Sequence, residues 1–221
     1  MSVIPLGDVS RRPVRAPVVT MLIILANVVV FALELVGGEA FVTRWSLIPD
    51  QFVTGRHLVT ILTGIFLHGG WSHIIGNMVF LWAFGPEIED TMGRVRYLVF
   101  YLLGGVVASL VQVAANAHST VPNLGASGAI AAVMGAFVVM FPGDRIKTLL
   151  FFLVFVRVRF VPAALLIGLW FVTQLVNVGA VANVETGGVA YAAHIGGFIF
   201  GALTARGFAS ARRDASRSWV K

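Results

Sequence analysis

Cysteine is absent from the 221 residues, and charged residues make up only 12% of them. The absence of cysteine excludes disulfides and thiolate chemistry. A soluble domain carries about a quarter of its residues as Asp, Glu, Lys and Arg, roughly twice the fraction found here. Together with a hydrophobic content of 58% and a mean hydropathy of +0.90, this composition is typical of an integral membrane protein built as a single domain.

Six apolar stretches have the length, or nearly the length, of a helix that crosses a bilayer. They are residues 17–36, 72–86, 97–116, 126–142, 160–178 and 186–205. The first stretch follows three arginines, as a signal sequence would, but it has no convincing cleavage site, so we expect it to be a retained anchor. Two shorter apolar segments, 58–67 and 149–156, are predicted to be interfacial or re-entrant.

The distribution of Lys and Arg predicts an orientation. With six crossings and an inside N-terminus, all basic residues except Arg44 and Arg56 fall on the inner side, as the positive-inside rule requires. We expect a cytoplasmic basic tail at 1–16, a membrane domain at 17–206, a second cytoplasmic basic tail at 207–221, and a location in the plasma membrane. The basic residues do not form one face interleaved with aromatics, so no nucleic-acid partner is expected.

Four polar residues are predicted to share one layer of the membrane, a little outward of the midplane. At 1.5 Å per helical residue, Ser127, His73, His194 and Asn77 lie roughly 24, 21, 18 and 15 Å above the inner face. Ser127 stands between glycines in Gly125-Ala-Ser-Gly128, and His194 interrupts a long apolar run. Because a histidine in hydrocarbon is costly and needs a partner, the pattern predicts a nucleophile and its base within the bilayer.

Each of these residues also has a structural explanation. Ser127 could be a helix N-cap, and His194 could be an interhelical hydrogen-bonding group. His73 and Asn77, four residues apart on one helix face, could hold helices together or donate to an oxyanion. Two rows of small residues allow the helices to approach closely. The rows are Ala193, Gly197, Gly201 and Ala205, and Gly128, Ala132 and Ala136.

Acidic and metal-dependent mechanisms are disfavoured. All five Asp residues lie outside the predicted spans, and so does every Glu except Glu34, which excludes a pair of intramembrane catalytic carboxylates. The HExxH zinc motif is absent. His68, His73 and His194 could form a three-histidine zinc site, but a five-residue spacing places the first two roughly 140° apart around a helix. No metal and no cofactor are therefore expected.

The motifs resemble those of the rhomboid family of intramembrane serine proteases over about residues 40–206. Besides the serine and histidine motifs, the resemblance rests on His68-x4-His73-x3-Asn77-Met78 and Gly85-x3-Glu89-x3-Gly93. It implies an all-α membrane protein, a six-transmembrane-helix rhomboid-like bundle whose first loop, 37–71, is embedded in the membrane. It also implies that Glu89 is structural.

The resemblance further implies that Ser127 is the nucleophile and His194 the general base. The oxyanion hole would consist of Asn77, His73 and the backbone N–H of Ser127. Two positions depart from the family pattern: Ala131 replaces an aromatic that often stacks on the histidine, and Val189 replaces a frequent glycine. What orients the His194 ring is therefore open.

We expect an intramembrane serine endopeptidase that cleaves single-span transmembrane substrates near the outer interface. Two other functions remain open from the sequence. One is a small transporter or proton channel with a relay of His68, His73 and His194. The other is a non-catalytic chaperone for membrane helices.

Overall fold

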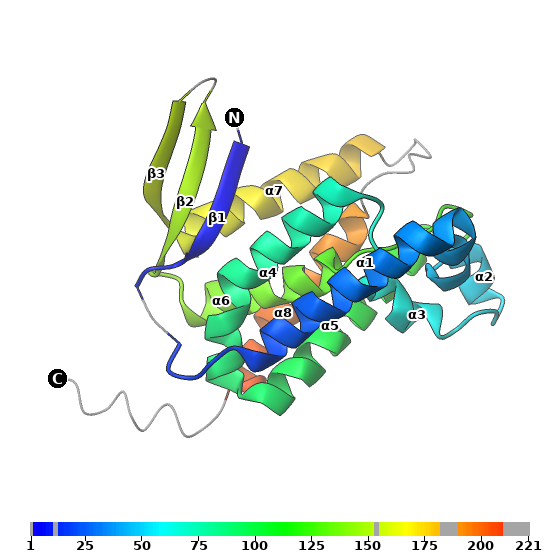
Figure 1. Ribbon diagram of the computed structural model, residues 1–221, viewed down its shortest axis with the longest axis horizontal. Coiled ribbons are helices and arrows are strands. Elements are labelled where there is room, and N and C mark those ends of the chain that lie inside the picture. Colours follow the sequence, from blue (N-terminus) through cyan, green and yellow to red (C-terminus); the bar gives the residue numbers. More distant parts are fainter. Residues whose placement is uncertain (1, 11–12, 153–154, 182–189, 210–221) are drawn as a thin grey trace.

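Six long helices form the body of the protein in a computed structural model, which describes residues 2–10, 13–152, 155–181 and 190–209. These helices are α1 (Val18–Trp45), α4 (Trp71–Met92), α5 (Arg94–Ala115), α6 (Ser127–Met140), α7 (Ala163–Val181) and α8 (Tyr191–Phe208). Each overlaps one predicted span (Figure 1). Among the described residues, α1 and α5 are long and apolar enough to cross a bilayer by themselves, so the number of crossings stays a prediction.

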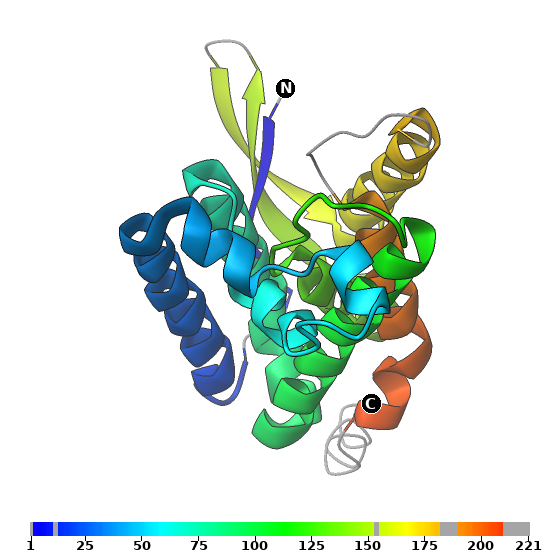
Figure 2. The same ribbon diagram turned by 90° about the vertical axis from the view of Figure 1, so that its right-hand side faces the viewer.

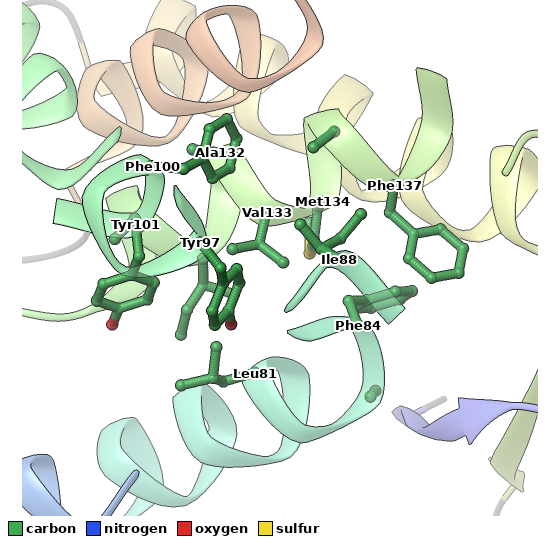
Figure 3. Close-up of a cluster of buried hydrophobic side chains, with 14 of the residues drawn as sticks. Leu81, Phe84, Ile88, Tyr97, Phe100, Tyr101, Ala132, Val133, Met134 and Phe137 are labelled. Carbon is green, nitrogen blue, oxygen red and sulfur yellow. The ribbon is translucent and has the colours of Figure 1, made fainter. Parts of the chain in front are cut away.

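Helix α6 lies at the centre of the bundle. Its residues 128–137 are all buried, and it packs against α4, α5 and α8. A helix that is apolar on every side is stable only when it is surrounded in this way. Aromatic and aliphatic side chains of α4, α5 and α6 meet beside it (Figure 3). They include Phe84 and Ile88 of α4, Tyr97 and Phe100 of α5, and Met134 and Phe137 of α6.

The two rows of small residues bring α6 and α8 into backbone contact, as predicted. A Cβ atom added at Gly197 would overlap the carbonyl oxygen of Gly128, and one added at Gly201 would overlap that of Ala132. In the opposite direction, a Cβ atom at Gly135 would overlap the carbonyl oxygen of Phe198. This close approach fixes the position of α8 along the axis of α6.

The first loop contains three short helical segments between α1 and α4 (Figure 2, light blue to cyan). They are α2 (Pro49–Val53), α3 (Thr60–Thr63) and the 3-10 helix η1 (Gly64–Phe66). Gly38 has a left-handed φ of 60°, which interrupts α1 close to the predicted end of the first span. The predicted interfacial or re-entrant segment 58–67 corresponds to α3 and η1.

A three-stranded antiparallel sheet at one end of the bundle was not predicted. It consists of β1 (Ser2–Asp8), β2 (Arg145–Phe152) and β3 (Phe155–Pro162), in the order β1-β2-β3 (Figure 1). The bundle is helical, as the all-α prediction requires, and the sheet adds strands in the N-terminal tail and on both sides of residues 153–154, where an interfacial or re-entrant segment was expected. Alternation of arginine with Val158 and Phe160 has the two-residue period of a strand, which the prediction did not use.

The motif Gly85-x3-Glu89-x3-Gly93 connects α4 to α1, and helix α4 continues past its predicted end to include Glu89. The Glu89 carboxylate accepts hydrogen bonds from the backbone N–H groups of Val19 and Thr20, at 2.9 and 2.8 Å, and from the Thr20 hydroxyl at 2.8 Å. These N–H groups belong to the first turn of α1 and have no partner within that helix. Glu89 thus caps α1, in agreement with the structural role that was expected.

Candidate active site

Ser127 and His194 are in direct contact. The distance from Ser127 Oγ to His194 Nε2 is 2.7 Å, although the two residues are 67 positions apart in the chain. Ser127 is the first residue of α6, and His194 lies in the first turns of α8. The close packing of α6 on α8 brings them together, so the predicted pairing is present in the geometry.

Gly125 shapes the backbone that presents the serine. Its φ of +130° lies in a region that L-residues rarely adopt. A Cβ atom at Gly125 would also lie 2.9 Å from both Cε1 and Nε2 of His73 and 3.6 Å from Ser127 Oγ. One edge of the His73 ring therefore reaches the same small space as the serine hydroxyl.

The first loop holds the segment before Ser127 in place. The backbone N–H of Gly125 donates to the carbonyl of Gly64 at 2.9 Å. Leu47 and Asn123 exchange two backbone hydrogen bonds, at 3.0 and 2.7 Å. The serine is thus held by α6 on one side and by the first loop on the other.

Asn77 and His73 are placed one helical turn apart on α4. Asn77 is buried, and within the described part of the chain its Nδ2 atom has no hydrogen-bond partner. A buried N–H donor without a partner is rare and requires an explanation. His73 Nδ1 accepts a hydrogen bond from the backbone N–H of Gly69 at 3.3 Å, which leaves its other edge facing Gly125.

Side chains of α7 and α8 contact the His194 ring. His194 Nδ1 lies 2.8 Å from Oε1 of Gln174 on α7. The Trp170 ring is 5.6 Å from the imidazole at an angle of 39°, and the Tyr191 ring is 6.4 Å away, nearly perpendicular to it. Ala131, one turn after Ser127, contributes no ring, and Val189 lies outside the described residues.

Sequence reasoning gave no role to three polar residues that support this region. Besides Gln174, Gln112 accepts the backbone N–H of Ala193 through Oε1 at 3.1 Å. Glu34 accepts the backbone N–H of His68 at 3.0 and 3.1 Å, which attaches the first loop to α1. All three lie within predicted apolar spans, so the depth argument applied to His194 could have found them.

Ser127, His194 and one edge of the His73 ring lie together, and Asn77 follows His73 one turn later on α4. Among the described residues, no group of three His, Cys, Asp or Glu side chains is placed to hold a metal ion. The His68 and His73 rings pack edge to face, with their centroids 5.1 Å apart. A cavity of about 30 Å³ borders Ser127 and is also lined by Ser109, Gln112 and Asn123. It can hold a water molecule, since it is larger than the ~10–15 Å³ that one water needs.

Comparison with known proteins identifies the family. Residues 55–211 match the family model described as the Rhomboid domain. The chain belongs to the rhomboid family. It is 32% identical over 184 residues to Rhomboid protein 1, mitochondrial, of Saccharomyces cerevisiae, covering 80% of this chain and 49% of that protein. It is 29% identical over 196 residues to Rhomboid protease GluP of Bacillus subtilis, covering 86% of this chain and 34% of that protein.

This rhomboid is a membrane protein that spans half or less of the length of these relatives. A third relative, RHOMBOID-like protein 12, mitochondrial, of Arabidopsis thaliana, is 32% identical over 129 residues, covering 51% of this chain and 38% of the relative. Two of the three relatives carry mitochondrial names, so the comparison gives no support to the predicted plasma membrane.

Proposed function

We propose that this rhomboid is an intramembrane serine endopeptidase in which Ser127 is the nucleophile and His194 the general base. The observation that carries the proposal is the 2.7 Å contact between Ser127 Oγ and His194 Nε2. A serine hydroxyl is a weak nucleophile until an adjacent base can remove its proton, and this distance is within hydrogen-bond reach.

The reaction proceeds by acyl transfer. Ser127 Oγ attacks the carbonyl carbon of a substrate peptide bond while His194 Nε2 accepts the hydroxyl proton. The tetrahedral intermediate collapses when the C–N bond breaks, and His194 returns the proton to the leaving amine. Water then attacks the acyl-enzyme, His194 accepts one of its protons, and the collapse of the second intermediate releases the new carboxyl end and restores Ser127.

Three donors supply the oxyanion hole in this mechanism. The backbone N–H of Ser127 is at the start of α6, where the helix dipole stabilises negative charge. The Nδ2 atom of Asn77, which has no hydrogen-bond partner among the described residues, and the edge of His73 that faces Gly125 are the other two. Fixed neutral donors of this kind stabilise the charge that develops in the transition state more than the neutral substrate.

The water for the second step has a place beside the serine. The cavity of about 30 Å³ has three polar residues, Ser109, Gln112 and Asn123, among those that line it. A buried water usually needs two to four polar partners, and this lining offers them. Hydrolysis within a lipid environment would otherwise lack a water molecule at the acyl-enzyme.

The substrates we propose are single-span transmembrane proteins. A membrane helix satisfies its backbone hydrogen bonds internally, so its carbonyls are shielded and it must unwind locally before cleavage. Cleavage near the outer interface follows from the predicted depth of Ser127. Six crossings, a plasma-membrane location and cytoplasmic termini remain predictions from the sequence, and residues 210–221 of the predicted C-terminal tail lie outside the described residues.

The decisive experiment incubates the purified full chain with a tagged single-span substrate. Ser127→Ala and His194→Ala are each expected to abolish cleavage while the protein stays folded and inserted, because each removes one half of the hydrogen-bonded pair. A fluorophosphonate should label Ser127 in the wild type, and a strong chelator should leave activity unchanged. Cleavage by either variant, or an adduct on another residue, would contradict the proposal. A transporter or chaperone would leave the substrate intact.

A further inference from the structure

The His194 ring is held on both of its nitrogen atoms, by residues from two different helices. Nε2 faces Ser127 Oγ of α6 at 2.7 Å, and Nδ1 faces Gln174 Oε1 of α7 at 2.8 Å. Both His194 and Gln174 are buried. A neutral imidazole has one N–H donor and one acceptor, so which nitrogen carries the proton decides whether the ring can act as a base toward serine.

The surroundings of Gln174 determine which way its amide points. Its Nε2 donates to the backbone carbonyl of Trp170 at 3.2 Å and contacts the Thr173 hydroxyl oxygen at 3.1 Å. The Trp170 carbonyl can only accept, so the amide nitrogen must be on that side. The amide oxygen therefore faces His194, and because it can only accept, the Nδ1 atom of His194 must carry a proton.

Because Nδ1 carries the proton, the other ring nitrogen, Nε2, can only accept a hydrogen bond in the neutral ring. With the proton on Nδ1, neutral His194 has its lone pair on Nε2, directed at the Ser127 hydroxyl. That is the tautomer a general base needs at the start of the reaction. When Nε2 gains the serine proton, the positive ring keeps its Nδ1–H bond to the amide oxygen, which is stronger for a charged donor.

Helix α7 also supplies an aromatic contact to the same ring. Trp170 lies one turn before Gln174, and its ring is 5.6 Å from that of His194. On α6, the residue one turn after the serine is Ala131, which has no ring to offer. The imidazole is thus oriented from α7, by one hydrogen bond and one ring.

We propose that Gln174 is a positioning residue that fixes the tautomer and orientation of His194 through its amide oxygen. The inference rests on the proposed function, since it assigns His194 the role of base. It makes the docking of α7 against α8 a condition for catalysis: when the two helices separate, the proton on Nδ1 loses its acceptor.

Two substitutions of similar size distinguish the effect of losing the hydrogen-bond acceptor from the effect of altered side-chain packing. Gln174→Met keeps the length of the side chain but removes the acceptor. Gln174→Glu, when its carboxyl is neutral, keeps a carbonyl for His194 and a hydroxyl for the Trp170 carbonyl. Leu175→Met, on the exposed side of α7, is the control for a change in this helix.

We expect Gln174→Met to lower kcat by about ten- to a hundredfold with KM nearly unchanged, the range that follows from leaving a buried donor unpaired. Gln174→Glu should recover most of that loss, and Leu175→Met should behave as wild type. Melting temperatures measured on the same preparations identify any loss that comes from unfolding. Wild-type kcat in folded Gln174→Met, or an equal loss in folded Gln174→Met and Gln174→Glu, would overturn the proposal.

The tautomer itself can be measured without turnover. In protein labelled with ¹⁵N-histidine, the His194 signals, assigned by their absence in His194→Ala, should show a protonated Nδ1 and an unprotonated Nε2 in the wild type. Gln174→Met should move the population toward protonated Nε2. A wild-type ring protonated on Nε2 alone would refute the proposal even if no variant folds. If Ser127→Ala still cleaves substrate, the assignment of Ser127 as the nucleophile fails, while the tautomer measurement still judges the role of Gln174 independently.

Discussion

Gly125→Ala is the most direct test of how the backbone presents Ser127. Two unfavourable contributions to the free energy of folding add at this position. The φ of +130° is unfavourable for any residue with a side chain, at about 1–3 kcal/mol. The new Cβ atom would also lie 2.9 Å from Cε1 and Nε2 of His73, closer than the ~3.5–4.0 Å at which non-bonded carbon atoms attract each other. Either the His73 ring or the turn before Ser127 must therefore move by several tenths of an ångström.

We expect this variant to lose more activity than stability. A moderate loss of about 1–3 kcal/mol in the free energy of unfolding leaves most molecules folded. Turnover should fall further, because the group that moves is either the turn that presents the nucleophile or one proposed oxyanion donor, and a single such donor is worth about 10²–10³ in kcat. The assay is cleavage of a tagged single-span substrate, with thermal unfolding followed on the same sample.

Gly207→Ala is the matched control. Gly207 is on α8, far along the helix from His194, and a Cβ atom there would meet nothing within 4 Å. Alanine in a helix is more favourable than glycine by about 1 kcal/mol, so this variant should be as stable as the wild type or more so, with unchanged turnover. If Gly125→Ala matched Gly207→Ala in turnover, the geometry assigned to the turn before Ser127 would be refuted.

Two further predictions concern the remaining parts of the site. Asn77→Ala should lower kcat by about 10²–10³ without changing apparent substrate affinity, because its unpartnered Nδ2 is the proposed donor; wild-type kcat with a lowered melting temperature would make Asn77 structural. Gly201→Val should abolish fluorophosphonate labelling of Ser127, because the side chain would overlap the Ala132 carbonyl and push α8 away from α6; undiminished labelling would show that the close packing does not position His194.

The helices and the contact between Ser127 and His194 could be predicted because both depend on local chemical patterns. A long apolar run specifies a membrane helix whatever its neighbours are, and a lone histidine in such a run requires a polar partner. The small-residue rows on α6 and α8 predicted that these helices pack closely, and this close backbone contact brings His194 to Ser127. The helices and this contact followed from these patterns, whereas the six-helix bundle was implied by the resemblance to the rhomboid family.

The sheet could not be predicted in the same way, because its strands come from distant parts of the chain. Strand β1 begins at Ser2 and pairs with β2, which begins at Arg145. An apolar run of eight residues, such as 149–156, is as compatible with an interfacial segment as with a buried strand until its partner is known. A hairpin with β3 supplies one partner and the N-terminal segment supplies the other, and neither pairing leaves a signal within the run itself.

The contacts of His194 show the same limit at the scale of one side chain. The depth argument flags any polar residue in an apolar span, and Gln174 meets that condition as well as His194 does. What the sequence does not contain is the direction of the amide, which depends on the Trp170 carbonyl lying beside its nitrogen. Because that carbonyl accepts the amide N–H, the amide oxygen is directed to His194 Nδ1, and the Nε2 lone pair is left for Ser127. A residue can thus be recognised as polar and buried from its sequence context, while the proton it positions is determined only by the three-dimensional arrangement of α6, α7 and α8.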